Sequence, residues 1–123
     1  LVCKSGGPAS RAMVQAIILS IKRSLPTFRF TSIQVNRNLR ATLHDDSANL
    51  GPSAFLEMGP FVGGGSWQSG ATRPTILRGA HWQVCSGLDP HCTLPFVGDR
   101  ISIVAFSSSA TSELYADAGS NAR

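Results

Sequence analysis

The stretch "DPHCTLPFVGDRISIVAF", residues 89–106, contains the clearest strand signal in the chain. Its last part, "RISIVAF", is rich in β-branched and apolar residues, which favour extended structure. We expect a turn at Val97-Gly98-Asp99, because glycine and aspartate are common turn residues, and a further strand before it in "HCTLPF". Short strands separated by such turns are typical of a β-sandwich or barrel.

Strand candidates of the same kind lie upstream of this stretch. They are "FRFTSIQVN", "LRATLH", "SAFLEMG", the glycine-broken "FVGGGSWQSG" and "HWQVCS". In "FRFTSIQVN" the side chains alternate with a period of two from Phe28 onward, which is the period of a strand. Together the candidates give about seven short strands, and they predict a β core at about residues 28–107.

A single helix is expected before the β core, at about residues 8–25. Pro8 suits the first turn of a helix, and Pro26 ends the pattern. Ile17 and Ile21 recur at helical spacing and mark an apolar stripe. Such a stripe predicts packing of the helix on a hydrophobic core.

The length of the chain, 123 residues, allows one hydrophobic core. We therefore expect a single domain at residues 1–107. Residues 108–123 are mostly small or polar and predict a flexible tail. The first residue is leucine rather than methionine, so the sequence is compatible with a fragment of a longer protein. No stretch is apolar for long enough to cross a membrane, and we expect no membrane partner.

Charge is distributed unevenly along the chain. The first 43 residues contain no acidic residue and seven basic ones, which are Lys4, Arg11, Lys22, Arg23, Arg29, Arg37 and Arg40. The rest of the chain contains four basic and seven acidic residues. A basic N-terminal part favours a polyanionic partner, whereas the alternative is a set of solvated surface charges. The charge pattern alone leaves both interpretations open.

The three cysteines, Cys3, Cys85 and Cys92, are scattered along the chain. An odd, unpatterned set argues against a disulfide framework and for free thiols. It also argues against a zinc site built from thiols, because no pair has ligand spacing. We therefore expect an intracellular, reducing compartment.

One histidine and two aspartates are adjacent at His44-Asp45-Asp46. On a strand, residues i and i+2 point to the same face, so His44 and Asp46 converge while Asp45 points away. For this pair alone, a capped turn with a surface histidine is the better interpretation. A functional site is favoured by His91, which opens one strand, and by Arg100, which opens the next strand nine residues later.

Two histidines and one carboxylate form the facial triad of non-haem Fe(II) oxygenases. They occupy one face of an octahedron and leave three positions for the co-substrate and dioxygen. His44, Asp46 and His91 have this composition, so we expect them to bind a metal ion. Arg100 has a planar cationic fork that suits the far carboxylate of a bound 2-oxo diacid.

The set His44-x-Asp46, His91 and Arg100 resembles the pattern of Fe(II)/2-oxoglutarate-dependent dioxygenases, whose fold is a double-stranded β-helix (jelly roll). The flanking text "FTSIQVNRN", "LHDDSANLGPS", "GPFVGGGSW" and "PHCTLPFVGDRISIVAF" is similar to the TET/JBP-like, DNA-modifying branch of algae and protists. The resemblance implies that the two histidines and Asp46 ligate Fe(II). It also implies that Arg100 anchors 2-oxoglutarate.

The resemblance further implies a co-substrate contact, an oxidant and a substrate. Asn36 matches a polar position that touches the co-substrate in related enzymes. Dioxygen is the implied oxidant, and ascorbate is an alternative to 2-oxoglutarate. The implied reaction is hydroxylation of a nucleobase, most of all 5-methylcytosine in DNA, which must be flipped out of the duplex. Arg37 and Arg40 would then hold the DNA backbone, and the protein would be nuclear.

Two other functions stay open from the sequence. One is a protein side-chain hydroxylase of the same superfamily. The other is a degenerate, non-catalytic domain, for instance of a mobile element. Salt-sensitive DNA binding would favour nucleobase oxidation over the first alternative, and absence of ferrous binding would favour the second.

Overall fold

The computed structural model describes residues 7–108, so the tail expected at 108–123 lies outside it from residue 109 onward. Within the described residues the chain has one helix followed by nine strands. They are α1 (Pro8–Ser24), β1 (Ser32–Arg37), β2 (Ser53–Met58), β3 (Phe61–Gly63), β4 (Ser66–Gln68), β5 (Thr75–Leu77), β6 (Gln83–Cys85), β7 (His91–Thr93), β8 (Phe96–Gly98) and β9 (Ile101–Phe106). The prediction of a mainly β domain with one N-terminal helix is confirmed.

Helix α1 forms where the sequence predicts it. Pro8 occupies the first turn, where its missing N–H leaves no hydrogen bond unmade. The last turn contains Lys22 and Arg23, whose charges interact favourably with the negative end of the helix dipole. The backbone N–H of Leu25 donates to the carbonyl oxygen of Ile21 at 2.7 Å and closes the helix.

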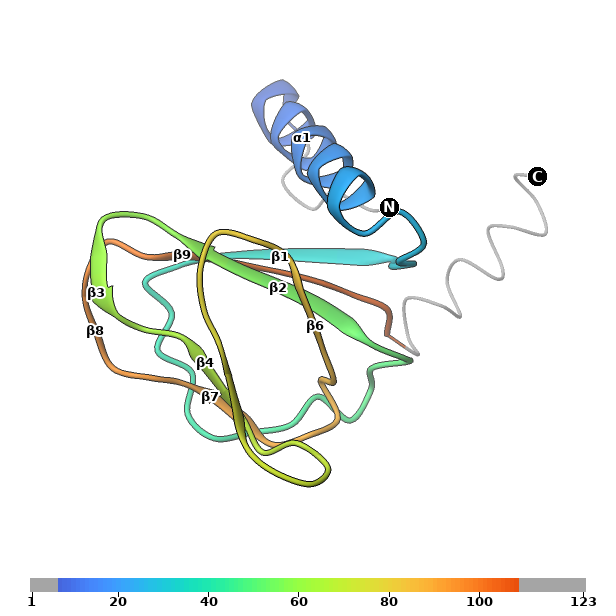
Figure 1. Cartoon of the computed structure of the whole chain (residues 1–123). Helices are drawn as coiled ribbons and strands as arrows, with labels where there is room; N and C mark the ends of the chain where they lie inside the picture. The colour runs from blue at the N-terminus through green and yellow to red at the C-terminus, as the bar shows by residue number, and fades with distance from the viewer. Residues whose placement is uncertain (1–6, 109–123) are drawn as a thin grey trace.

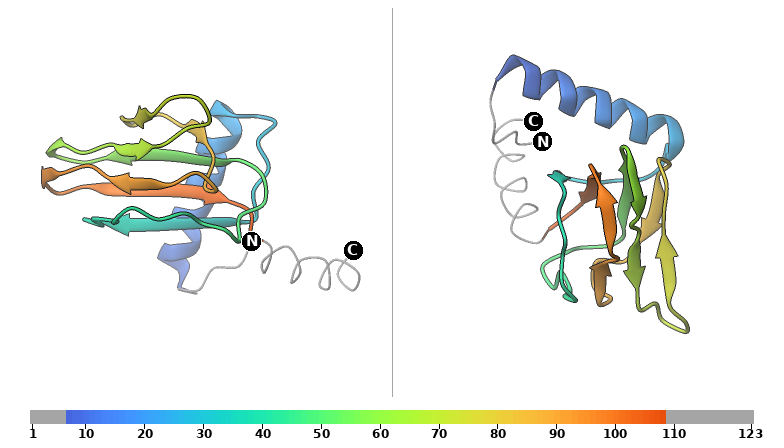
Figure 2. Two further views of the ribbon diagram at one scale, coloured as in Figure 1. Left: turned by 90° about the horizontal axis from the view of Figure 1, so that it is seen from below. Right: turned by 90° about the vertical axis from the view of Figure 1, so that its left-hand side faces the viewer.

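The strands form a four-stranded sheet in the order β1-β9-β2-β6 and a three-stranded sheet in the order β5-β4-β7. All neighbouring strands are antiparallel. A two-stranded ribbon, β3-β8, lies where the chain passes between the two sheets. Helix α1 covers the outer face of the four-stranded sheet, and the three-stranded sheet lies on its other side (Figures 1 and 2).

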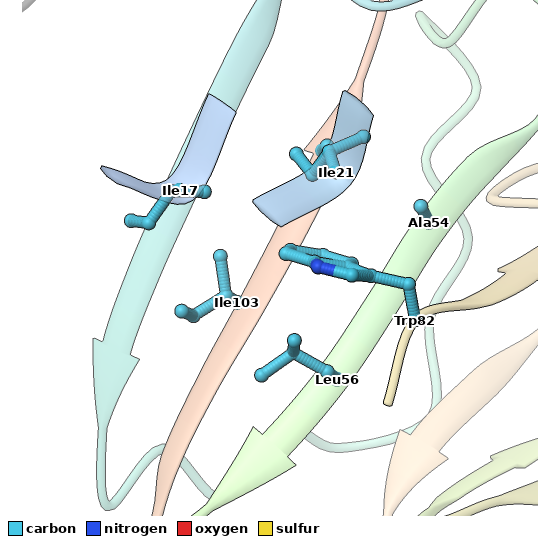
Figure 3. Packing of buried hydrophobic residues seen from close by; sticks show 7 residues of the cluster. Ile17, Ile21, Ala54, Leu56, Trp82 and Ile103 are labelled. Atoms are coloured by element: carbon cyan, nitrogen blue, oxygen red, sulfur yellow. The ribbon is translucent and has the colours of Figure 1, made fainter. Parts of the chain in front are cut away.

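The hydrophobic core lies between α1 and the four-stranded sheet, as Figure 3 shows. Ile21 is fully buried and belongs to one cluster with Leu56 of β2 and Ile103 of β9. Trp82 belongs to the same cluster, and its indole N–H donates to the hydroxyl of Ser20 at 3.0 Å. The helix is therefore attached to the sheet by apolar burial and by a side-chain hydrogen bond.

Alternate residues of β2 and β9 have different roles on the two sides of the sheet. Leu56 and Ile103 belong to the core under the helix, whereas Phe55 and Ser102, one position away, line a cavity. This period of two follows from strand geometry. One face of the sheet thus forms the core, and the other forms a wall of the cavity between the sheets.

The strand expected at "LRATLH", residues 39–44, is not formed as a regular strand. Only His44 pairs, in an isolated antiparallel bridge with His91. The N–H of Ala41 donates to the hydroxyl of Thr93 at 3.1 Å, and the N–H of Thr93 donates to the carbonyl oxygen of Ala41 at 2.9 Å. A side-chain hydrogen bond therefore takes the place of a ladder bond in this segment.

Two other strand predictions and one turn prediction need correction, and one strand was missed. "HCTLPF" divides into β7 and β8, because Pro95 has no backbone N–H for a ladder. Val97 and Gly98 belong to β8 rather than to a turn. Strand β1 begins at Ser32 rather than at Phe28. The short β5, largely exposed, was not predicted because it lacks an alternating pattern.

Candidate metal centre

Three of the predicted site residues, His44, Asp46 and His91, meet at the cavity between the sheets. Their possible ligand atoms all lie within 4.8 Å of one another. One carboxylate oxygen of Asp46 lies 3.1 Å from Nε2 of His91, and the other lies 3.9 Å from Nε2 of His44. Ligand atoms about 2.1 Å from a shared ion lie roughly 3–4 Å apart, so this spacing suits one metal ion.

The backbone holds the two histidines opposite each other. The N–H of His44 donates to the carbonyl oxygen of His91 at 3.0 Å, and the N–H of His91 donates to that of His44 at 2.8 Å. His91 also pairs with Gln68 of β4 on its other side. Both imidazoles therefore project from positions fixed by backbone pairing.

Asp46 reaches the histidines because its loop is tied to the segment after β6. The N–H of Asp46 donates to the carbonyl oxygen of Gly87 at 2.8 Å, and the N–H of Asn49 donates to that of Asp46 at 3.0 Å. A Cβ at position 87 would lie 2.3 Å from Nδ2 of Asn49, so a larger residue there would require the Asn49 side chain to move. Asp45 is not part of the group. Loop hydrogen bonds, rather than the strand alternation expected from sequence, direct the carboxylate.

Both histidines present the same ring nitrogen to Asp46. Nδ1 of His44 lies 2.6 Å from the backbone oxygen of Thr42, and Nδ1 of His91 lies 2.7 Å from that of Asp89. A carbonyl oxygen only accepts hydrogen bonds, so each Nδ1 has a proton and donates it. Nε2 of each ring remains available on the side of the carboxylate. Histidines that bind metals usually donate their other ring N–H in this way.

The cavity that the triad lines has a volume of about 220 Å³. Asn36 and Arg100, which were predicted to hold the co-substrate, line the same cavity. Ser102 lines it as well and lies directly opposite Asn36 in the β1–β9 ladder. Drug-sized ligand pockets start at about 300 Å³, so this cavity suits a small molecule.

The partner of Arg100 is Glu57 on β2, which sequence reasoning missed. Both side chains are only 2% exposed. Nε of Arg100 donates to one oxygen of Glu57 at 3.0 Å, and Nη2 forms an ion pair with the same oxygen at 2.9 Å. The N–H of Gly65 donates to that oxygen at 2.9 Å. The available signal was an acidic residue inside the apolar strand "SAFLEM", since a buried charge requires a partner.

The two arginines predicted to contact DNA are not among the residues that line the cavity. Arg37 forms a two-bond salt bridge with Asp99 at 2.9 and 3.0 Å on the surface. This hydrogen-bonded pair lowers the pKa of Asp99 and raises the pKa of Arg37. The guanidinium carbon of Arg40 lies 3.8 Å from the centroid of the Phe96 ring, within cation–π distance.

Cys85 lines the cavity together with the triad. Burial, followed by the negative charge of Asp46, raises the pKa of its thiol to about 11. The thiol is therefore protonated at neutral pH, and only a thiolate binds metals well. Cys85 and Cys92 are both free.

No known protein-family model matches the chain, and no curated protein sequence matches it. Within residues 7–108, no helix is long and apolar enough to cross a membrane. The function must therefore follow from the side chains and the fold that positions them.

Proposed function

We propose that the chain is an Fe(II)- and 2-oxoglutarate-dependent dioxygenase that hydroxylates a nucleobase, 5-methylcytosine in DNA. The observation that supports it most is the convergence of His44, Asp46 and His91 in the cavity that Arg100 also lines. Two imidazoles and one carboxylate are the ligand set of ferrous oxygenases. A ferrous ion held there supplies oxidation of a C–H bond by dioxygen and a 2-oxo acid.

The pairing order of the strands supports a double-stranded β-helix. β1 pairs with β9, the segment at His44 with β7, β2 with β6, and β4 with β5. With β3 and β8 set aside, these pairs are nested, because each pair lies inside the previous one along the chain. In a jelly roll the chain folds back on itself so that its two halves pair, and the paired halves wind into a helix that forms two facing sheets. The β3-β8 pair lies outside this nested order and forms where the chain passes from one sheet to the other.

The polar atoms of the triad favour a positive charge at their centre. Nε2 of His91 and a carboxylate oxygen of Asp46 are 3.1 Å apart, and Nδ1 already donates to a backbone carbonyl. Two lone-pair atoms at this distance repel each other unless a proton or cation lies between them. One divalent ion satisfies the carboxylate and the Nε2 atoms of both His91 and His44 at once.

The state of Arg100 supports an acid as co-substrate. Its Nη1 has no hydrogen-bond partner among residues 7–108, although the side chain is buried and lines the cavity. The guanidinium therefore keeps an edge for a carboxylate. Ser102 contributes a hydroxyl to the same wall, and Asn36 contributes an amide.

The distribution of basic residues supports DNA as the partner. All seven basic residues of the first 43 positions precede His44 without an acidic residue among them. Arg37 ends β1, and Arg40 follows in the segment that leads to the metal centre. Phosphate contacts there would hold the backbone while a flipped base enters the cavity.

The test is an anaerobic titration with Fe(II) and 2-oxoglutarate, monitored in the visible spectrum. We expect the weak charge-transfer band of the iron chelate in the wild type and its loss in Asp46→Ala. A wild-type protein that binds no ferrous ion would contradict the proposal and favour a non-catalytic domain.

A further inference from the structure

We propose that Glu57 sets the strength with which the cavity binds a carboxylate, by acting as the resident counter-charge of Arg100. The inference rests on the proposed role of Arg100 as the acid anchor. It gives Glu57 a positioning role without contact to the ligand. Geometry, donor number and charge each support it.

Glu57 lies behind the guanidinium as seen from the cavity. Arg100 lines the cavity wall, and Glu57 does not. One oxygen of the carboxylate accepts hydrogen bonds from Nε of Arg100 and from the backbone N–H of Gly65, and it forms an ion pair with Nη2 of Arg100. Its other oxygen accepts no hydrogen bond from residues 7–108. Glu57 therefore holds the side of Arg100 that faces away from the ligand.

The pair leaves Arg100 with donors to spare. An arginine has five N–H donors, and Glu57 engages only the edge formed by Nε and Nη2. The edge between Nη1 and Nη2 can still make two parallel hydrogen bonds to a second carboxylate. Arg100 can therefore bind Glu57 and a ligand at the same time, one on each edge.

The charge of Glu57 has two opposite effects. In the empty protein it neutralises a guanidinium that is 2% exposed, and an unpaired charge at such a depth is costly. It also cancels much of the positive potential that would attract an anion, so an incoming carboxylate gains hydrogen bonds but little net attraction. Glu57 thus stabilises the empty protein and lowers its affinity for an acid.

The test compares Glu57→Gln with the wild type, with glutarate as the probe. Glutarate has two carboxylates but no 2-oxo group, so it does not require chelation to a metal ion. Glutamine keeps the size and an acceptor oxygen for the same donors but removes the charge. We expect the variant to melt at a lower temperature without ligand and to bind glutarate about tenfold more tightly in calorimetry. Structural damage would weaken binding, so tighter binding by a less stable protein separates the two explanations.

Two controls accompany this comparison. Asp99→Asn removes the acidic partner of an exposed arginine and should leave the glutarate affinity unchanged. Glutaramide, which has no charge, should bind to neither protein. Equal or weaker glutarate binding by Glu57→Gln, or no binding by either protein, would overturn the role of Glu57. A failed ferrous titration with tighter glutarate binding intact would overturn the oxygenase proposal alone and support the charge-setting role.

Discussion

His44 and His91 exchange two backbone hydrogen bonds across a single β-bridge, and this contact joins the two segments of the candidate metal centre. Each imidazole has its Nδ1 on a backbone carbonyl and its Nε2 on the side of Asp46. Because the bridge is made by the backbone, replacing either side chain removes a ligand and leaves the bridge. The ligands can therefore be tested one at a time.

Asp46→Ala is expected to abolish ferrous binding, whereas Asp45→Ala should keep most of it. Both aspartates are exposed, but in the described part of the chain Asp46 is the one carboxylate grouped with the two histidines. Calorimetric or spectroscopic titration with Fe(II) under nitrogen measures both variants. The reverse order of effects would mean that the loop presents the other aspartate to the ion.

Sequence was sufficient to predict the class of fold, because helical and strand periods are local properties. The apolar stripe around Ile17 and Ile21 predicted α1, and "RISIVAF" predicted β9. The segment at 39–44 was wrongly expected to be a strand, because the hydroxyl of Thr93 captures the N–H of Ala41 from a distant part of the chain. A local sequence pattern does not show that a distant side chain will accept the hydrogen bond that a backbone carbonyl of a neighbouring strand would otherwise accept.

The candidate site was predictable in composition but not in all its partners. His44, Asp46 and His91 could be grouped because their residue types suit one ion. The position of Glu57 in the apolar strand "SAFLEM" indicated a buried charge that needs a partner, but the sequence did not identify Arg100 as that partner, because the pairing depends on sheet register. In the structure Glu57 lies opposite Ser102 in the β2–β9 ladder, two residues from Arg100.

Arg100→Lys is expected to weaken 2-oxoglutarate binding by about tenfold or more while ferrous binding survives. A lysine ammonium can pair with Glu57, but it has no second planar edge for the ligand. The apparent affinity is read from the chelate band at increasing 2-oxoglutarate concentration. Unchanged affinity would mean that another residue anchors the acid, or that ascorbate is the co-substrate.

Cys85 should react slowly with iodoacetamide at neutral pH and faster as the pH approaches about 11, which is the raised pKa of its thiol. Folding favours the protonated thiol, so its stabilising contribution is complete below the ordinary thiol pKa of about 8.5 and is lost as the pH rises toward about 11. Mass spectrometry of a variant with serine at Cys3 and Cys92 measures the rate. Asp46→Asn should move the onset to lower pH, and an unchanged onset would exclude the charge of Asp46 as a cause.

Ile21→Ala should lower the free energy of unfolding by about 2–5 kcal/mol, because it creates a cavity between α1 and the four-stranded sheet. Ile21 is fully buried in the cluster with Leu56 and Ile103. Leu19→Ala on the exposed side of the same helix is the control and should cost less than about 0.5 kcal/mol. Urea unfolding followed by tryptophan fluorescence reports both, since Trp82 belongs to the cluster. Equal effects would mean that the helix does not depend on this contact.

The last prediction concerns DNA. If Arg37 and Arg40 contact phosphates, replacing both by glutamate should weaken binding and reduce the slope of log affinity against log salt by about two. Ferrous binding should be unchanged, because neither residue belongs to the triad. The control replaces Arg73 and Arg78 by glutamate, which changes the net charge by the same amount. It should weaken DNA binding less, because these two residues lie outside the basic N-terminal part.

The salt bridge of Arg37 makes this prediction sharper. Asp99 accepts two hydrogen bonds from the guanidinium of Arg37. Asp99→Asn should therefore free Arg37 to contact phosphate and should strengthen DNA binding. Fluorescence anisotropy with a methylated duplex measures affinity, and nucleoside digests after incubation with Fe(II) and 2-oxoglutarate reveal any oxidised pyrimidine. If the protein consumed 2-oxoglutarate but neither bound DNA nor altered its bases, nucleobase oxidation would be excluded. The protein side-chain hydroxylase would then stand as the alternative, because the proposed metal ligands do not themselves specify which C–H bond is oxidised.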